Sequence, residues 1–192
     1  MSHNLLHSLQ DSLGLNPIKK IDPNTQQVIH PENHDKFSQS AVPTVLLGLY
    51  KFGNTEQGSA SILRGTATGD WFSEFFGDKT DEAISKVSEY SGESTDYTSN
   101  GLREIANRAV GLIREQVPVN AKFEAVKSYI NEQRNPILKS LPAELQLGYL
   151  FNDNSIDDRT HKMEGPMSNH MHFFEKLFSG STTEKNENTQ NS

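Results

Sequence analysis

The sequence AVPTVLLGLYKFG, residues 41–53, decides the fold, because its apolar side chains cover most of the circumference of a helix. We expect a largely buried helix with Pro43 in its first turn. Roughly ten apolar residues are too few to span a bilayer, which takes about twenty. The stretch therefore predicts the central helix of a helical core, with apolar positions Val42, Val45, Leu46, Leu47, Leu49, Tyr50 and Phe52.

Two short helices are expected next. The segment 56–64 has several packing positions, and Gly65 after it suits the left-handed conformation that often ends a helix. The segment before Gly77 carries aromatic residues at i, i+1, i+4 and i+5, which one helical turn presents on one side. Such clusters are usually core, whereas an exposed one would mark a partner groove. The residues of this cluster are Trp71, Phe72, Phe75 and Phe76.

Two longer amphipathic helices should follow. Thr80 is a candidate cap for the first, whose first turn carries carboxylates that favour the positive end of the helix dipole, and Gly92 ends it. Ser94 or Thr95 caps the second. Its apolar side chains recur at helical spacing, at Leu102, Ile105, Ala106, Ala109, Val110 and Ile113.

Four features occur in order along this part of the chain. They are a proline near the start of the first helix (Pro43), a glycine in the turn region after it (Gly58), a Phe-Gly pair (Phe76-Gly77) and a Ser-Gly turn before the last helix (Ser91-Gly92). With these features, residues 41–117 resemble the DUF937 or YidB-like family of bacterial proteins. The chain departs from that family in lacking its Gly-Leu-Leu-Gly-rich low complexity. The resemblance implies a helical fold and transfers no catalytic residue.

Composition limits the function classes. The 192 residues include 25 acidic and 18 basic side chains, for a net charge of −7, which disfavours attraction to nucleic acid or anionic lipid. There is no cysteine, which excludes disulfides and thiolate metal sites and is compatible with a reducing compartment. A mean hydropathy of −0.66 predicts a modest core with part of the chain unpacked. We expect a cytoplasmic protein.

The regions flanking the central part divide by composition. Residues 1–16 lack a signal peptide and form a short amphipathic helix with a leucine stripe at Leu5, Leu6, Leu9 and Leu13. Residues 17–40 are expected to be a linker or mobile loop, and its His30 and His34 are poorly placed to bind a metal because Pro31 separates them.

The remaining chain completes the expected helical domain, residues 41–179. Its C-terminal helices, 118–179, are interrupted by Pro118, Pro136 and Pro142 and include an apolar group from Leu145 to Phe151. A last amphipathic helix is expected at 166–178. Residues 180–192 are polar and predict a disordered tail.

The segment 153–172 concentrates carboxylates and imidazoles. Asp153, Ser155, Asp157 and Glu164 match positions 1, 3, 5 and 12 of a calcium loop, but Asp158 replaces the glycine that position 6 needs. His161, with Glu164 and two later histidines, His170 and His172, could instead bind a transition metal, although no pair has the spacing of a zinc helix. The third interpretation is a polar connector in which Asp153 or Asn154 caps a turn.

A nucleic-acid function is a further alternative. From Ala83 to Ile105 we expect a helix, a Ser-Gly turn and a second helix. This is the layout of a helix-turn-helix DNA reader. The second helix, however, begins with Glu93, Ser94 and Asp96, and its first basic residue is Arg103. Carboxylates at that position would repel phosphate.

The sequence therefore predicts an all-α, compact multihelical domain of short amphipathic helices. It contains no P-loop, GxSxG elbow or dinucleotide glycine motif, so we expect no catalysis and no cofactor. The first hypothesis for function is a module for protein–protein interaction or self-association. The alternatives are the helix-turn-helix DNA reader and a metal-binding protein that uses residues 153–172.

Overall fold

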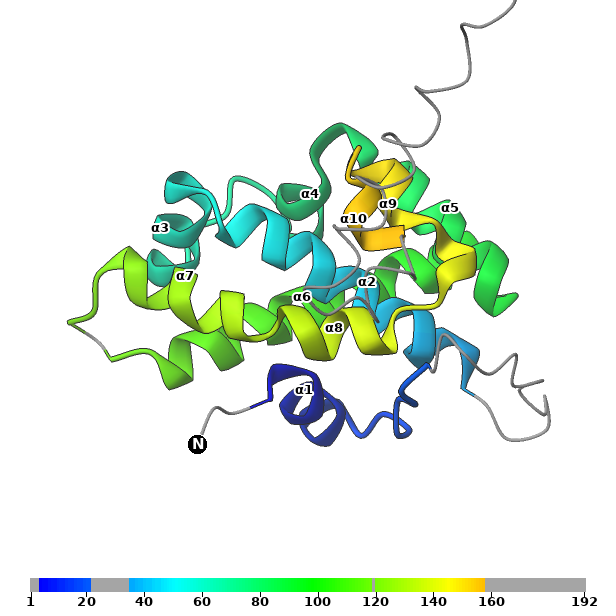
Figure 1. The fold of residues 1–192 in the computed structure, drawn as a ribbon, viewed down its shortest axis with the longest axis horizontal. Helices are drawn as coiled ribbons and strands as arrows, with labels where there is room; N and C mark the ends of the chain where they lie inside the picture. Colours follow the sequence, from blue (N-terminus) through cyan, green and yellow to red (C-terminus); the bar gives the residue numbers. More distant parts are fainter. Residues whose placement is uncertain (1–3, 22–34, 119, 158–192) are drawn as a thin grey trace, which may run out of the picture. The chain divides into compact units, whose positions relative to one another are not determined.

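The protein is all-α in a computed structural model that describes residues 4–21, 35–118 and 120–157, and no strand occurs in these ranges (Figure 1). This confirms the predicted fold class. The α-helices are α1 (Leu5–Leu13), α2 (Lys36–Gly53), α3 (Glu56–Arg64), α4 (Trp71–Phe76), α5 (Thr80–Ser91), α6 (Thr95–Gln116), α7 (Phe123–Glu132), α8 (Arg134–Ser140), α9 (Leu147–Leu150) and α10 (Asn154–Asp157). Two 3-10 turns, η2 (Gly77–Lys79) and η3 (Ala143–Leu145), connect them. The helix expected at 166–178 and the tail expected at 180–192 lie outside the described residues.

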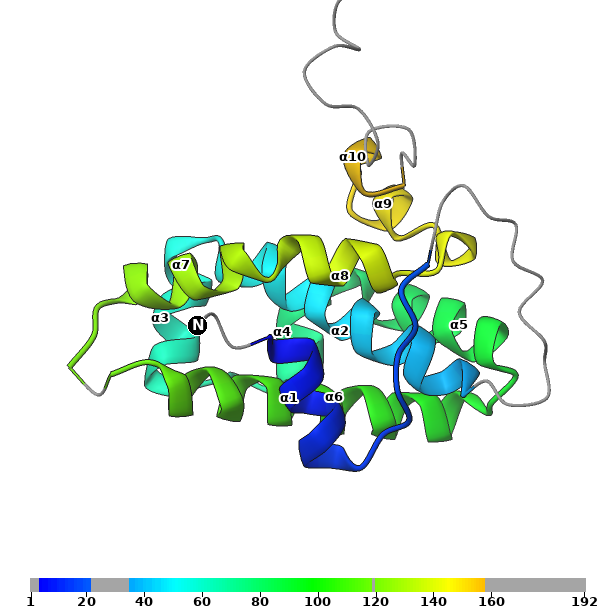
Figure 2. The same cartoon turned by 60° about the horizontal axis from the view of Figure 1, so that its bottom comes forward.

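Helix α2 is the centre of the bundle. It packs against α1 and every helix from α3 to α8, and Figure 2 shows it lying between α8 and α6. Every residue from 38 to 49 is buried. The continuous apolar pattern of 41–53 predicted this position. None of the helices in the described ranges is long and apolar enough to cross a membrane.

The start of α2 differs from the expectation. The helix begins at Lys36 after Asp35, whose carboxylate accepts a hydrogen bond from the Ser38 amide at 2.9 Å. Pro43 therefore lies inside the helix, and its predicted place in the first turn is wrong. Residues 36–40, assigned to the linker from their polarity, belong to α2. The apolar pattern missed them because all but Phe37 are polar. Ser38, Gln39 and Ser40 are nevertheless buried, with their side chains hydrogen-bonded within the fold.

Two glutamines join segments that are far apart in sequence. The Gln39 amide nitrogen donates to the carbonyl oxygens of Ser140 at 2.8 Å and Lys19 at 3.1 Å. The Gln133 side-chain oxygen accepts a hydrogen bond from the Leu5 amide at 2.9 Å. A buried amide side chain satisfied in this way holds its neighbours in one register. Helix α1, with Leu9 fully buried, is thereby docked on the core.

The aromatic cluster of α4 belongs to the core, as predicted. Its four rings are buried, and Phe52 of α2 lies 5.5 Å from Phe75 and 6.5 Å from Trp71 between ring centroids. Phe76 reaches Phe151, beyond α9, at 5.3 Å. Large buried rings supply much of the apolar area of a small core. The cluster therefore ties α2, α4 and the C-terminal helices together.

Two further expectations need correction. Thr80 is the first residue of α5 and not its cap, because its hydroxyl donates to the Gly77 carbonyl oxygen at 2.7 Å and the η2 turn leads straight into the helix. Tyr149, expected among the core residues of 145–151, is 84% exposed because α9 has a single turn and one face toward solvent. Ser94, by contrast, caps α6 as predicted.

Two helical glycines give a matched test of packing. A Cβ at Gly58 would lie 2.0 Å from the Phe52 carbonyl oxygen, whereas the nearest atom to a Cβ at Gly111 is 3.7 Å away. We expect Gly58→Ala to lower the free energy of unfolding by at least about 2 kcal/mol, because a backbone atom must move. Gly111→Ala should raise it by about 0.5–1 kcal/mol. Urea unfolding measures both, and equal effects would contradict the close approach at Gly58.

Candidate functional site

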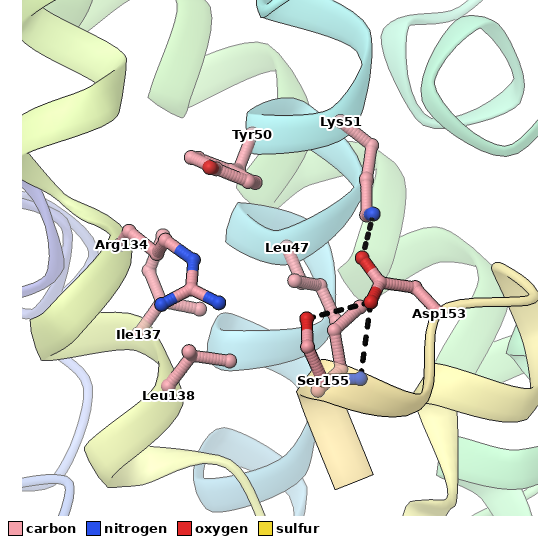
Figure 3. A pocket seen from close by; sticks show the side chains of 9 residues that line it. Leu47, Tyr50, Lys51, Arg134, Ile137, Leu138, Asp153 and Ser155 are labelled. Atoms are coloured by element: carbon pink, nitrogen blue, oxygen red, sulfur yellow. Dashed lines mark hydrogen bonds and ion pairs between the residues drawn. The ribbon is translucent and has the colours of Figure 1, made fainter. Parts of the chain in front are cut away.

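A pocket of about 210 Å³ lies where the C-terminal half of α2 meets α8 and α10 (Figure 3). Its apolar wall comes from three helices that the core packing holds in place. Its polar groups come from the last turns of α2, the start of α8 and the turn into α10. The apolar lining residues are Leu47, Ile137, Leu138 and Ile156, and the polar ones are Tyr50, Lys51, Arg134, Asp153 and Ser155.

Asp153 and Lys51 form an ion pair at one end of the pocket. The Lys51 ammonium donates to the Asp153 carboxylate, and both side chains are about one-third exposed, at 31% and 29%. The same carboxylate accepts hydrogen bonds from the Ser155 hydroxyl at 2.6 Å and the Ser155 amide at 3.1 Å. These donors, the Lys51 ammonium first, hold the pKa of Asp153 below its usual value, although partial burial opposes the shift. Asp153 is therefore ionised at neutral pH, and it caps the turn into α10 as the connector interpretation expected.

Arg134 lies at the other end of the pocket. It is the first residue of α8, and its half-buried side chain points its guanidinium between Tyr50 and Leu138 (Figure 3). Within the described residues the guanidinium takes part in no hydrogen bond or ion pair. Lys51 and Asp153 neutralise each other, so Arg134 leaves the pocket with one positive charge.

The polar groups of the pocket are poorly arranged for acid–base or nucleophilic catalysis. A serine nucleophile needs a neighbouring base whose pKa is close to the working pH. Among the described residues, the Ser155 hydroxyl donates a hydrogen bond to Asp153 alone, and the lowered pKa of that carboxylate makes it a weak base. The arrangement can bind and orient an anion, because a guanidinium offers several N–H donors in a planar fork.

The residues proposed for a metal are only partly described. Asp153 lies in the pocket and already binds Lys51, and Asp157 ends α10, with its side chain outside the described part. Glu164, His161, His170 and His172 lie outside the described residues, as do His30 and His34. Across the described ranges, no group of three or more His, Cys, Asp or Glu side chains could hold a metal ion. The metal-binding alternative stays a prediction.

Sequence reasoning missed Lys51, Arg134 and Tyr50 as site residues. One signal was available for Lys51, because it is the one charged side chain in the otherwise apolar or small stretch 41–53. Such a residue must reach solvent or a partner. Arg134 gave no comparable signal, since it stands in a polar segment between two short helices.

The layout of the helix-turn-helix alternative is present in the fold. Helix α5 packs against α6, with Gly92 in the left-handed conformation between them. The exposed residues at the start of α6 include Asp96 and Tyr97, and Glu93 precedes them. This surface carries negative charge where a DNA reader needs positive charge. DNA binding stays an untested alternative.

The Lys51–Asp153 pair predicts a pH-dependent contribution to stability. A carboxyl group whose pKa is lower in the folded than in the unfolded chain stabilises the fold above its unfolded pKa, about 3.9, and loses this effect as the pH falls through the folded pKa. We expect Asp153→Asn to lower the free energy of unfolding by about 1 kcal/mol at pH 7. The loss should shrink steadily below about pH 4.

Urea unfolding at pH 7, 4 and 3 measures this effect. Lys51→Met serves as the companion variant, because it keeps the aliphatic stem and removes the charge. In a double-mutant cycle with Asp153→Asn, the coupling should be about 0.5–1 kcal/mol at pH 7 and fall with pH. A loss that is the same at every pH would show that Asp153 acts through packing alone.

No protein-family model, curated protein or solved structure matches this chain. The resemblance of residues 41–117 to the YidB-like family is therefore untested and stays a hypothesis.

Proposed function

We propose that this chain is a non-catalytic protein-binding module whose pocket at Arg134 takes one carboxylate group of a partner protein. The observation that carries the proposal is the half-buried side chain of Arg134, which lines the pocket and whose guanidinium has no hydrogen-bond or ion-pair partner among the described residues. The lack of cysteine supports a cytoplasmic location within the same proposal.

The environment of Arg134 favours an anion. A charged group that leaves water without a partner raises the free energy of the fold, and a bound anion would offset this cost. The apolar side chains of Leu47, Ile137 and Leu138 lower the local dielectric constant, which strengthens attraction between opposite charges. A carboxylate matches the guanidinium fork with two parallel hydrogen bonds.

The volume of the pocket favours one residue of a protein over a cofactor. Pockets for metabolites and cofactors usually have volumes of about 300–1,000 Å³. At about 210 Å³ this pocket suits one side chain or one chain terminus. A single anchoring pocket of this kind is typical of recognition between proteins, where a few residues carry most of the binding free energy.

The charge balance favours a carboxylate over a phosphate. A phosphate monoester carries a charge of about −1.5 to −2 at pH 7. That charge exceeds the single positive charge that Arg134 leaves in the pocket once Lys51 and Asp153 are paired. The pocket has one net positive charge, which one carboxylate neutralises.

The test uses the full chain, labelled for nuclear magnetic resonance, and small probes. N-acetyl-leucine carries one carboxylate, and N-acetyl-leucine amide is its neutral match. We expect saturable shifts of the Arg134 side-chain N–H and the methyl groups of Ile137 and Leu138, with a Kd on the order of 1 mM. Arg134→Gln should weaken binding at least about tenfold, since a hydrogen bond to a charged group contributes about 1.5–3 kcal/mol.

Arg64→Gln is the matched control variant. It removes the same charge from an exposed position at the end of α3 and should leave binding unchanged. The proposal is wrong if the amide binds equally well or if Arg134→Gln binds as the unaltered chain does. N-acetyl-glutamate α-amide separates a side-chain carboxylate from a chain terminus. Tighter binding of N-acetyl-O-phosphoserine amide would assign the pocket to phosphate instead.

Self-association is a special case of this proposal, in which a second copy supplies the carboxylate. The mass in solution would then rise with protein concentration, and Arg134→Gln would return the chain to the monomer. Arg64→Gln would leave the mass unchanged. If the chain is a monomer at all concentrations, the carboxylate must come from a different protein.

A further inference from the structure

A second hollow, of about 300 Å³, lies between the first turns of α2 and α6 and the C-terminal end of α1. It shares no residue with the Arg134 pocket. We call it the aromatic groove and define it by Leu13, Leu15, Asp35, Phe37, Tyr97 and Glu104. We propose that the aromatic groove binds a cationic side chain, an arginine or a lysine, of a protein partner.

The aromatic wall of the groove is built by a pair of rings. Phe37 of α2 and Tyr97 of α6 meet edge to face, with ring centroids 5.1 Å apart and planes at 64°. A Cβ at Gly101 would lie 2.4 Å from the tip of the Phe37 ring, so the glycine lets this ring lie against α6. Tyr97 remains 55% exposed, and among the described residues only Tyr149 is another large hydrophobic residue so exposed. An exposed tyrosine held in one orientation offers its ring face to a ligand.

The charge of the groove selects a cation. No lysine, arginine or histidine is among its described lining residues, while Asp35 and Glu104 carry negative charge. Asp35 caps α2, but Glu104 is exposed and takes part in no hydrogen bond or ion pair within the described ranges. A cation over an aromatic face, close to a carboxylate, gains from both attractions. Nucleic acid would meet like charge here.

The rings and the apolar residues at the end of α1 and just after it argue for an organic cation instead of a metal ion. A metal ion needs several oxygen or nitrogen ligands around one point, and the described residues provide no such group. A guanidinium or ammonium on an aliphatic stem can instead place its stem on Leu13 and Leu15 and its charge near Glu104. Residues 22–34, which precede Asp35 in the sequence, contain neither lysine nor arginine.

The probe is the tripeptide acetyl-Gly-Arg-Gly-amide, and acetyl-Gly-citrulline-Gly-amide is its neutral match of the same shape. With the full chain, the δ-methylene protons of the arginine probe should shift upfield in the ring current of Tyr97, and the citrulline probe should not shift. Tyr97→Leu, which keeps an apolar side chain, should abolish the upfield shift and weaken binding about two- to fivefold. Glu104→Gln should weaken binding by a similar factor at low salt.

Two controls keep the outcome clear. Glu82→Gln removes a charge from an exposed position in the first turn of α5 and should change nothing. Arg134→Gln should also leave binding of the arginine probe unchanged. The experiment therefore distinguishes an error in the proposal for the carboxylate pocket from an error in the proposal for the aromatic groove. Melting curves of Tyr97→Leu and Glu104→Gln verify that both fold.

The proposal is overturned if the citrulline probe binds as well as the arginine probe, or if neither variant affects binding. It is also overturned if Tyr97→Leu lowers the mass in solution while the probe does not bind, since the groove would then be an interface between copies of this chain. The same probe with lysine in place of arginine ranks the two cations.

Discussion

The burial of α2 from residue 38 to residue 49 is the constraint on which the rest of the structure depends. A helix buried on all sides needs neighbours on all sides, and short helices before and after it provide them. Among the polar side chains in the buried stretch, the Thr44 hydroxyl has no hydrogen-bond partner within the described residues, whereas Gln39 bonds to the backbone of Lys19 and Ser140. These bonds hold the segment before α2 and the end of α8 against the same helix. The positions of both pockets follow from this packing.

Helix ends and apolar faces could be predicted because local chemistry determines them. Gly65 and Gly92 adopt left-handed conformations that side chains disfavour, and Ser94 bonds the first turn of α6. The start of α2 could not be predicted in this way. Apart from Phe37, its first residues are polar. Local hydrogen bonds at Ser38 and Ser40 and long-range ones at Gln39 make the burial of these three side chains favourable. The prediction that Tyr149 is buried was wrong for the opposite reason. Its neighbours in the sequence are apolar, but a helix of a single turn still has one face toward solvent.

The candidate site was harder to predict than the fold, because its residues meet only in three dimensions. Lys51 and Asp153 are separated by 102 positions, and no local pattern records their pairing. Asp153 was singled out from a metal-ligand spacing, whereas its carboxylate here accepts hydrogen bonds from an ammonium and from Ser155. A charged residue in an otherwise apolar helix, such as Lys51, is a better signal for such a site than a motif is. Even this signal requires the fold for its interpretation, and Arg134 gave none.

The two pockets have opposite charges, and this difference bears on how a weak binder becomes specific. If both proposals hold, a single carboxylate at Arg134 or a single cation beside Glu104 would bind with only about millimolar affinity, because each charge must leave its hydration shell. Two such contacts made by one partner make the second contact intramolecular, and the combined affinity rises by orders of magnitude when the spacing matches. A partner with the charges reversed would meet repulsion at both places. Specificity would thus come from the order and spacing of the charges on the partner, because the helical bundle presents two binding pockets of opposite charge.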